Sequence, residues 1–313
     1  MEIVEDTLAQ IFEAHRRELQ AHCYRMLGSV QDAEDVVQES MFAAWRAYAG
    51  FEGRSSVRTW LFRITTNRCL NFLRDSARKP LPGTEVPLPE PTHVGEPLWL
   101  EPFPDLLLDG VPDAAPGPDA RYEAKEAISL AFVAAVQYLP PRQRAVLLLR
   151  DVLGYRAAQV AELLDMTEDA VAGALKRARA AMPLPVPAQP VDPTLGGRFA
   201  AAFEAGDMAA LVGLLAEDVR LTMPPLPVAY VGRAVTMDFL TRIAFRDDRR
   251  YRLVPVGANR QVAFGCYLRD GYAGCWRAHG VLVLDASGAE VRALTRFVDN
   301  SVLPAFGLPR RLT

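Results

Sequence analysis

The sequence lacks any apolar run that approaches the roughly 20 residues a helix needs to cross a bilayer. Its first ten residues, MEIVEDTLAQ, are acidic and contain no apolar signal-peptide core. Both absences argue against a membrane-embedded or secreted protein, and they predict a cytoplasmic one.

Cysteine and histidine are also scarce, with four of each in 313 residues. Cys23, Cys69, Cys266 and Cys275 form no C-x-x-C pair, so we expect reduced thiols rather than a disulfide framework. A metal site built from Cys266, Cys275 and His279 is conceivable, but a structural role for these side chains is favoured. We therefore predict neither a metal nor a cofactor.

The net charge of −3 hides strongly segregated segments. Residues 1–52 carry 10 acids against 4 bases, residues 53–79 carry 7 bases against 1 acid, and residues 80–123 carry 9 acids against 1 base. The short basic segment concentrates the positive charge that nucleic-acid phosphates require. A nearly neutral average therefore does not exclude nucleic-acid binding.

Proline divides the chain. Residues 80–123 hold 11 of the 24 prolines and almost no helical period, which predicts an extended acidic linker. A shorter Pro-rich tether is expected at 183–195. Helical periodicity occupies 8–79, in three segments, and 124–181. These two segments predict two all-α domains.

The C-terminal part has a different pattern. Helices are expected at 196–217 and 234–246. Strands are expected at 218–223, 251–256, 261–269, 274–285 and 290–299, with turns at Gly257, Asp270-Gly271 and Ser287-Gly288. Helices followed by a mostly antiparallel sheet predict a small α+β domain.

The expected helix at 58–78 has two unlike faces. At 100° per residue, Leu61, Thr65, Cys69 and Phe72 form an apolar side. The opposite side carries bases and amides: Arg63, Asn67, Asn71, Arg74 and Arg78. Arginine binds phosphates and asparagine recognises base edges, so this face is a candidate DNA surface. Trp60 projects toward it, either to stack on an unpaired base or to pack under the preceding loop.

Residues 137–180 have helix-turn-helix spacing. The motif needs a small residue, a turn residue that tolerates left-handed dihedrals and a later aliphatic, and Ala161, Asp165 and Val171 meet these needs. Thr167 is a suitable N-cap for the second helix. The expected DNA contacts are Lys176 and Arg177 in the major groove, with Arg179 at the flank and Arg156 on phosphate. The alternative is an ordinary αα-hairpin with a charged face.

The stretch from Asp32 to Lys79, DAEDVVQESMFAAWRAYAGFEGRSSVRTWLFRITTNRCLNFLRDSARK, resembles the second conserved region of sigma-70 family factors of the extracytoplasmic-function group. The resemblance implies that the acidic helix binds the clamp helices of the polymerase β′ subunit. That role falls on Asp35, Gln38 and Glu39, with Asp32 and Glu34 flanking. It also implies that the loop Phe51–Ser56, including Arg54 and Ser55, captures a flipped base, and that the next helix opens the −10 element.

Residues 139–180 resemble the fourth region of the same family, which binds the −35 element and the β flap. The order of the two regions is also that of the family, and no third domain separates them. In related factors the linker threads toward the RNA exit channel, where its acidity would mimic nucleic acid.

Residues 197–240 resemble SnoaL-like domains, which have a cone-shaped α+β fold around a pocket. The landmarks include Gly206-Asp207, Asp218-Val219 and Tyr230-x-Gly232-Arg233. Met223, Tyr230, Trp276 and His279 could line a pocket, but a core role is the default for all four. A subset of extracytoplasmic-function factors carries such a domain, and the resemblance implies a built-in regulator that touches the sigma domains.

The sequence therefore predicts a multidomain protein: 1–79 sigma region 2, 80–123 linker, 124–182 sigma region 4, 183–195 tether and 196–313 SnoaL-like domain. We expect a non-enzymatic transcription initiation factor whose partners are the polymerase core and promoter DNA. Two alternatives stay open: a conventional helix-turn-helix regulator without a polymerase partner, and a SnoaL-type enzyme fused to a DNA-binding segment.

Overall fold

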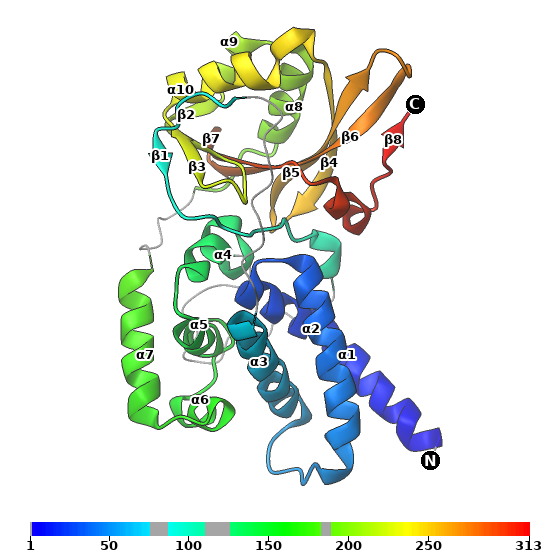
Figure 1. Ribbon diagram of the computed structural model, residues 1–313, viewed down its shortest axis with the longest axis vertical. Helices are drawn as coiled ribbons and strands as arrows, with labels where there is room; N and C mark the ends of the chain where they lie inside the picture. The colour runs from blue at the N-terminus through cyan, green and yellow to red at the C-terminus, as the bar shows by residue number, and fades with distance from the viewer. Residues whose placement is uncertain (1, 76–86, 110–125, 183–188) are drawn as a thin grey trace. The chain divides into compact units, whose positions relative to one another are not determined.

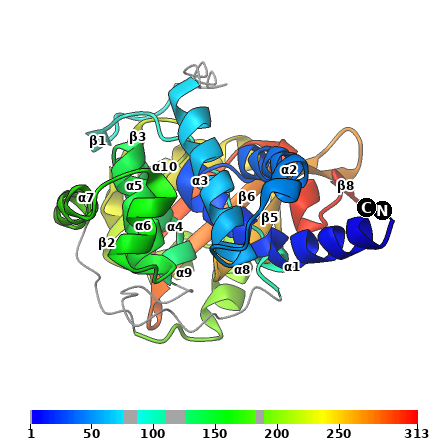
Figure 2. The same cartoon turned by 90° about the horizontal axis from the view of Figure 1, so that it is seen from below.

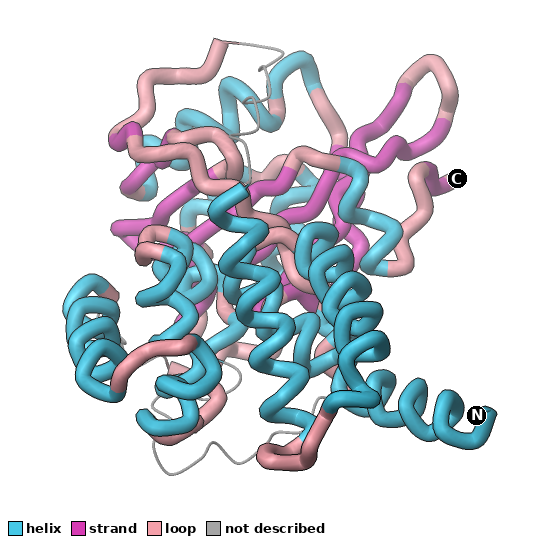
Figure 3. The backbone as a smooth tube through the Cα atoms, turned by 60° about the horizontal axis from the view of Figure 1, so that its bottom comes forward, coloured by secondary structure: helices cyan, strands magenta, loops and turns pink. Residues whose placement is uncertain are grey.

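The computed structural model describes residues 2–75, 87–109, 126–182 and 189–313. The chain forms two compact units. The first unit combines Met1–Arg78 with Leu107–Leu184, and the second combines Lys79–Leu106 with Pro185–Thr313. Figure 3 shows helices in the first unit and the strands in the second.

Three long helices open the first unit (Figures 1 and 2): α1 Glu2–Leu27, α2 Val30–Ala47 and α3 Val57–Asp75, with a 3₁₀ turn at Tyr48–Gly50 after α2. They confirm the three helical segments expected within residues 8–79. Ser29 caps α2, because its Oγ accepts a hydrogen bond from the Asp32 N–H at 3.0 Å. Tyr24, Leu61 and Phe62 are buried between the helices.

The rest of the first unit is also helical. Its elements are a 3₁₀ turn at Glu126–Ile128, α4 Leu130–Gln137, α5 Pro141–Leu147 continued by a π-helical turn at Leu148–Val152, α6 Ala157–Leu164 and α7 Glu168–Ala181. Pro141 begins α5 at a position where its missing N–H is not needed.

Buried arginine joins these helices to α1. Arg144 donates hydrogen bonds to the carbonyls of Met26, Gln137 and Leu139, and Arg25 Nε donates to the carbonyl of Ala127 at 2.9 Å. Burial lowers the pKa of each guanidinium to about 10. A buried charge is tolerated only with such partners, so these contacts bind the two helical halves into one unit.

The second unit is built on one eight-stranded sheet with the order β1-β3-β2-β7-β6-β5-β4, in which β8 pairs with β6. The β2–β7 pair is parallel and the other pairs are antiparallel. The strands are β1 His93–Val94, β2 Leu215–Thr222, β3 Val228–Val231, β4 Tyr251–Ala258, β5 Gln261–Asp270, β6 Cys275–Ser287, β7 Glu290–Phe297 and β8 Arg311–Leu312.

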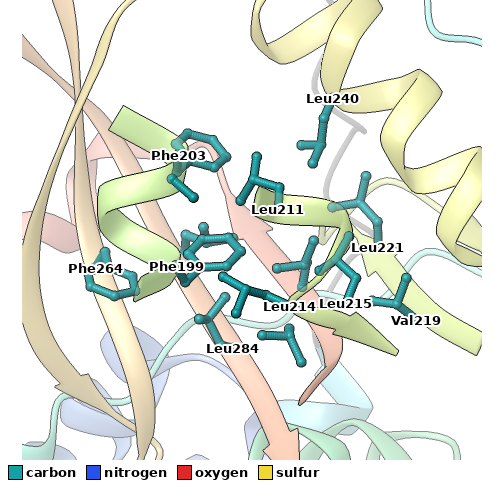
Figure 4. Close-up of a cluster of buried hydrophobic side chains, with 14 of the residues drawn as sticks. Phe199, Phe203, Leu211, Leu214, Leu215, Val219, Leu221, Leu240, Phe264 and Leu284 are labelled. Carbon is teal, nitrogen blue, oxygen red and sulfur yellow. The ribbon is translucent and has the colours of Figure 1, made fainter. Parts of the chain in front are cut away.

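Helices cover one face of this sheet. They are α8 Leu195–Ala205, α9 Met208–Val212 and α10 Arg233–Phe239 with a π-helical turn at Leu240–Ala244. Short 3₁₀ turns lie at Asp105–Leu107, Arg246–Asp248 and Asn300–Phe306. Phe199 and Phe203 of α8 point toward Phe264 and Leu284 on the strands, and Leu211 and Leu221 extend the cluster (Figure 4). The interior between helices and sheet is therefore filled by apolar side chains.

The α-helical first unit and the mixed second unit confirm the expected fold class. Three short strands, β1, β3 and β8, were not anticipated. The turn expected at Gly257 lies instead at Asn259 and Arg260, where both residues have φ of +57°. Gly257 lies within β4, where its backbone approaches the carboxylate of Asp105 too closely for a side chain to fit.

Candidate polymerase and nucleic-acid surfaces

The polar face of α3 is exposed as expected. Arg63, Asn71 and Arg74 are exposed and Asn67 is half-buried, whereas Leu61, Thr65 and Cys69 on the opposite side are buried. Arg74 is held by its neighbour, since its Nε lies 2.8 Å from Asp75 Oδ1. Arg78 lies outside the described residues. The face presents guanidinium and carboxamide groups that can meet phosphates and base edges.

The loop before α3 packs an aromatic cluster. The Trp60 ring lies 4.9 Å from the Phe51 ring and 6.2 Å from the Tyr48 ring, measured between centroids. Trp60 is half-buried and packs against this loop, and its stacking on an unpaired base stays a prediction. Arg54 is exposed and ion-pairs with Glu52 at 3.1 Å, and Ser55 is half-buried.

The acidic surface of α2 divides into two parts. Asp35, Gln38 and Glu39 are exposed, and Glu39 pairs with Arg68 of α3 at 2.9 Å. Glu34, in contrast, accepts hydrogen bonds from Arg16, Gln20 and Gln38. This flanking carboxylate fastens α2 to α1. Asp32 is half-buried in the first turn of α2, where its charge suits the helix dipole.

Sequence reasoning missed an apolar part of this surface. Phe42 and Trp45 are 67% and 54% exposed on α2. Phe42 borders an open hollow of about 570 Å³, lined by Glu39, Phe42, Ala43, Arg46, Ala47 and Arg68. Large exposed apolar side chains beside a charged rim are typical of an interaction surface. The spacing of Phe42 and Trp45, three residues apart on one helix, was the available signal.

The helix-turn-helix has the expected local geometry. Asp165 ends α6 in the left-handed region, with φ of +50° and ψ of +54°, and Thr167 Oγ1 accepts a hydrogen bond from the Ala170 N–H. On α7 the buried residues are Val171, Ala174, Leu175 and Ala178. Lys176 and Arg177 are exposed on the other side. The structure therefore places both predicted base-contacting residues where a groove can reach them.

The two flanking arginines differ. Arg179 is held within the fold, because its Nε and Nη2 donate to the carboxylate of Asp151 at 2.9 and 2.6 Å, and Asp151 is only 1% exposed. Arg156 is exposed at the start of α6, where its N–H donates to Gln159 Oε1 at 2.8 Å. Arg156 is thus available to phosphate, whereas Arg179 orients α7.

The two candidate DNA surfaces touch one another. Arg63 Nη2 on α3 lies 3.5 Å from Asp165 Oδ1 in the turn between α6 and α7. Arg58 donates to Tyr155 Oη at 3.0 Å, and its guanidinium lies 4.8 Å from the Phe62 ring centroid. In this arrangement the helix-turn-helix approaches the face of α3 that is predicted to meet DNA.

In the second unit, the core role expected by default holds for Met223 and Tyr230 but not for Trp276. Met223 and Tyr230 belong to the apolar core, while His279 lies 6.0 Å from the Tyr251 ring. Burial, together with the nearby charges of Arg296, Arg249 and Arg246, lowers the pKa of His279 to about 4. Trp276 lies on the opposite side of the sheet, against Arg252. Within the described residues, no three His, Cys, Asp or Glu side chains form a group suited to a metal ion.

None of the helices in the described part of the chain combines the length and apolar character that a bilayer crossing requires.

Comparison with known proteins assigns each segment. Family models match as Sigma-70 region 2 over residues 11–79, Sigma-70 region 4 over residues 129–182 and a SnoaL-like domain over residues 197–299. The ECF RNA polymerase sigma factor SigG of Mycobacterium tuberculosis is 42% identical over 316 residues, covering 96% of this chain and 83% of the relative. SigJ of the same species is 34% identical over 221 residues, covering 67% of this chain and 63% of that relative.

The fold is similar to that in the crystal structure of M. tuberculosis SigJ. The match has a TM-score of 0.64 at 24% identity and covers 96% of this chain and all of the other.

Proposed function

Because the chain belongs to the extracytoplasmic-function group of the sigma-70 family, with a C-terminal SnoaL-like domain, we propose specific roles for its surfaces. Sigma factors bind the RNA polymerase core and promoter DNA, and they initiate transcription without catalysing a covalent reaction. Here α2 meets the β′ clamp helices through Asp35, Gln38 and Glu39, and the helix-turn-helix half meets the β flap. The protein acts in the cytoplasm with the polymerase.

DNA contacts are assigned to the two exposed faces described above. The face of α3 engages the −10 element, with Phe51, Arg54 and Ser55 in the preceding loop, and Trp60 supports that loop. Lys176 and Arg177 enter the major groove of the −35 element, with Arg156 on phosphate. The observation that carries this proposal is the exposure of Arg63, Asn71 and Arg74 opposite a buried face on the same helix.

Core binding is tested with the variant Asp35→Ala/Glu39→Ala in the full chain. We expect retention on immobilised polymerase core to fall at least tenfold, and run-off transcription from a cognate promoter to fall with it. Glu13→Ala, an exposed carboxylate on α1, is the matched control. Unchanged retention by the double variant would remove α2 from the interface, and transcription independent of the wild-type chain would contradict the whole proposal.

We further propose that the C-terminal unit modulates the sigma activity by holding the linker. In the second unit, β1 extends the sheet edge: His93 and Val94 pair with Ala229 and Val228 of β3. Thr92 Oγ1 donates to the Ala229 carbonyl at 2.9 Å and accepts from the Val231 N–H at 2.8 Å. Main-chain pairing of an extended segment with a sheet edge is a common mode of peptide capture.

The linker is fastened again about ten residues later. Phe103 is fully buried, its N–H donates to Asn259 Oδ1, and the Asn259 N–H donates to the Phe103 carbonyl, both at 2.8 Å. Asp105 Oδ1 accepts from the Arg260 N–H at 2.7 Å. Residues held at these two places are withdrawn from any path through the polymerase, so the held state is the inactive one.

The contact of Arg63 with Asp165 supports the same conclusion. The −10 and −35 elements are separated by tens of ångströms of duplex, at 3.4 Å per base pair. Two DNA-binding surfaces that lie within ion-pairing distance cannot occupy both elements, so the first unit must open on the promoter.

Modulation is tested by weakening the linker contacts. Thr92→Val removes two hydrogen bonds, and Asn259→Gly removes a side-chain acceptor at a position whose positive φ suits glycine. The double variant should raise transcription several-fold and expose residues 87–106 to limited proteolysis. Thr241→Val, which alters an exposed hydroxyl in the turn after α10, is the control. Faster proteolysis with unchanged transcription would show that linker capture has no regulatory role.

A further inference from the structure

Arginines gather on the outer face of the sheet near the hairpin between β5 and β6. The strand register pairs Arg252 with Tyr267 and Arg269 with Trp276. Side chains alternate between faces along a strand, so Arg252, Arg269 and Trp276 share one face, opposite the buried Tyr251 and Cys266. Figures 1 and 3 show this hairpin projecting beside β8 and the C-terminus.

The two guanidinium groups stack on one indole ring. The Cζ atoms of Arg252 and Arg269 lie 4.7 and 5.4 Å from the Trp276 ring centroid. Arg269 Nη1 also donates to the Gly274 carbonyl at 2.9 Å. Stacking on an aromatic face restrains a guanidinium, while its N–H edge remains available to an acceptor. Both arginines are exposed, so those edges face solvent.

Carboxylates nearby do not neutralise this face. Asp270 binds Arg277 and caps the turn through the N–H groups of Tyr272 and Ala273. Asp247 and Asp248 are exposed in the preceding turn, where Asp247 pairs with Arg246. In the described parts of the chain, no carboxylate lies within ion-pairing distance of Arg252 or Arg269. Arg250 and Arg310, both exposed, extend the positive charge, since their carbonyls accept from the N–H groups of Arg269 and Ala278, each at 3.0 Å.

We propose that this outer arginine surface, Arg250, Arg252, Arg269 and Arg310 around Trp276, binds the sugar–phosphate backbone of a nucleic acid. Guanidinium groups match phosphate oxygens better than any other side chain. The fully exposed Tyr272 at the hairpin tip adds an aromatic ring on which an unpaired base can stack. This combination favours a nucleic acid over an acidic protein segment, which needs cations but no aromatic platform. The SnoaL-like domain then contributes its own contact with the template or transcript.

The test uses the full chain, with Arg252→Gln/Arg269→Gln compared with Arg220→Gln/Arg292→Gln, two exposed arginines of β2 and β7. Binding is measured across a salt series for three fluorescently labelled probes: a 30-base-pair DNA duplex, and single-stranded DNA and RNA of 30 nucleotides. Each phosphate contact contributes about 0.9 to the slope of log K against log salt for duplex DNA and about 0.7 for a single strand. The first variant should reduce the magnitude of the slope by roughly 1.8 for duplex DNA or 1.4 for a single strand. The control pair should leave the slope unchanged.

Equal slopes for both variants and the wild type would overturn the proposal. A photocrosslinking residue in place of Tyr272 gives a second measurement that needs no arginine substitution: labelled nucleic acid should crosslink there, and its failure to do so would count against the surface. The arginine variant could instead lose binding to anionic lipid vesicles or polyglutamate while its binding to all three nucleic acids stays the same as the wild type. That result would assign the surface to another partner and overturn the proposal.

Discussion

Arg63 on α3 lies 3.5 Å from Asp165, the left-handed residue in the turn between α6 and α7. One ion pair thus connects the candidate −10 surface to the helix-turn-helix. The pair is solvent-exposed and contributes at most about 1 kcal/mol, so it can be broken without unfolding the unit. Opening on the promoter must also break the Arg58–Tyr155 hydrogen bond and the buried contacts of Arg25 and Arg144, so this pair is one of several contacts that hold the two helical halves together.

Substitutions of Asp165 distinguish the effect of backbone strain on stability from the effect of the carboxylate charge. Asp165→Gly should keep or raise the melting temperature, because glycine adopts a φ of +50° without steric cost. Asp165→Val should destabilise the first unit by roughly 1–2 kcal/mol, because a β-branched residue is strained there. Asp165→Asn removes only the charge and serves as the control. Thermal denaturation followed by calorimetry gives the comparison, and equal stability of the Gly and Val variants would contradict the turn geometry.

Asn67 and Asn71 are predicted to act in promoter opening rather than in polymerase binding. The double variant Asn67→Ala/Asn71→Ala should abolish permanganate reactivity of unpaired thymines at the −10 element, because the carboxamides no longer contact the separated bases. Its affinity for polymerase core should match the wild type in a pull-down. Loss of both activities together would mean that this face of α3 is not a DNA surface.

Arg179 and Lys176 lie three residues apart on α7 but should behave differently. Arg179→Ala leaves the buried Asp151 carboxylate without its bidentate partner and should lower the free energy of unfolding by roughly 3 kcal/mol. Lys176→Ala should leave stability unchanged within about 0.5 kcal/mol and weaken binding to a −35 fragment. Urea denaturation and DNA-binding titrations measure the two effects. Equal destabilisation by both variants would contradict a structural role for Arg179 and a DNA-binding role for Lys176.

His22 should make the first unit sensitive to acid. Burial, followed by Arg25 and Arg58, lowers its pKa from 6.5 to about 3, so the folded state binds a proton less readily than the unfolded chain. The contribution of neutral His22 to the free energy of unfolding is therefore fully present well above pH 6.5. It is lost as the pH falls toward 3, and the loss reaches about 2 kcal/mol at pH 5.

His22→Gln keeps a donor near Thr66, the hydrogen-bond partner of the imidazole at 2.9 Å, and removes this titration. The difference in unfolding free energy between wild type and variant should therefore shrink as the pH falls from 7 to 5. A difference that stays constant over that range would contradict the buried neutral histidine. His93→Gln, an exposed histidine of β1, is the control.

The four thiols should be alkylated in a fixed order. Cys23 and Cys69 are fully buried with their sulfur atoms 3.6 Å apart, and Cys266 is 2% exposed, whereas Cys275 is partly accessible. Burial also raises the pKa of the Cys23 thiol, which lowers the fraction of reactive thiolate. Iodoacetamide at pH 8, followed by peptide mass spectrometry, should label Cys275 first. Rapid labelling of Cys23 in the folded protein would contradict the buried site.

Local patterns predicted much of the protein. Periodicity identified the helices of the first unit, and the spacing of Ala161, Asp165 and Val171 predicted a turn whose dihedral angles and N-cap the structure confirms. These features depend on interactions within a few residues, such as hydrogen bonds to the next turn and the steric limits on φ. The roles of the site residues in polymerase and promoter binding stay predictions.

Contacts between distant segments could not be inferred in this way. Glu34 and Arg179 resemble exposed interface residues in the sequence, and only packing gives them internal partners in Arg16, Gln20 and Asp151. Trp276 was expected in the core, with a pocket position as the alternative, but it lies on the outer face of the sheet; the face of a strand cannot be assigned before its register is known.

By itself, the sequence determined the family, the order of the domains and the amphipathic faces of α3 and α7, because each is encoded in local spacing and residue type. Only the tertiary structure decided that linker residues around Thr92 and Phe103 belong to the C-terminal sheet, and that Arg252 and Arg269 share the ring of Trp276. Both arrangements depend on hydrogen bonds and side-chain contacts between segments far apart in the chain, and no periodicity within either segment specifies its partner.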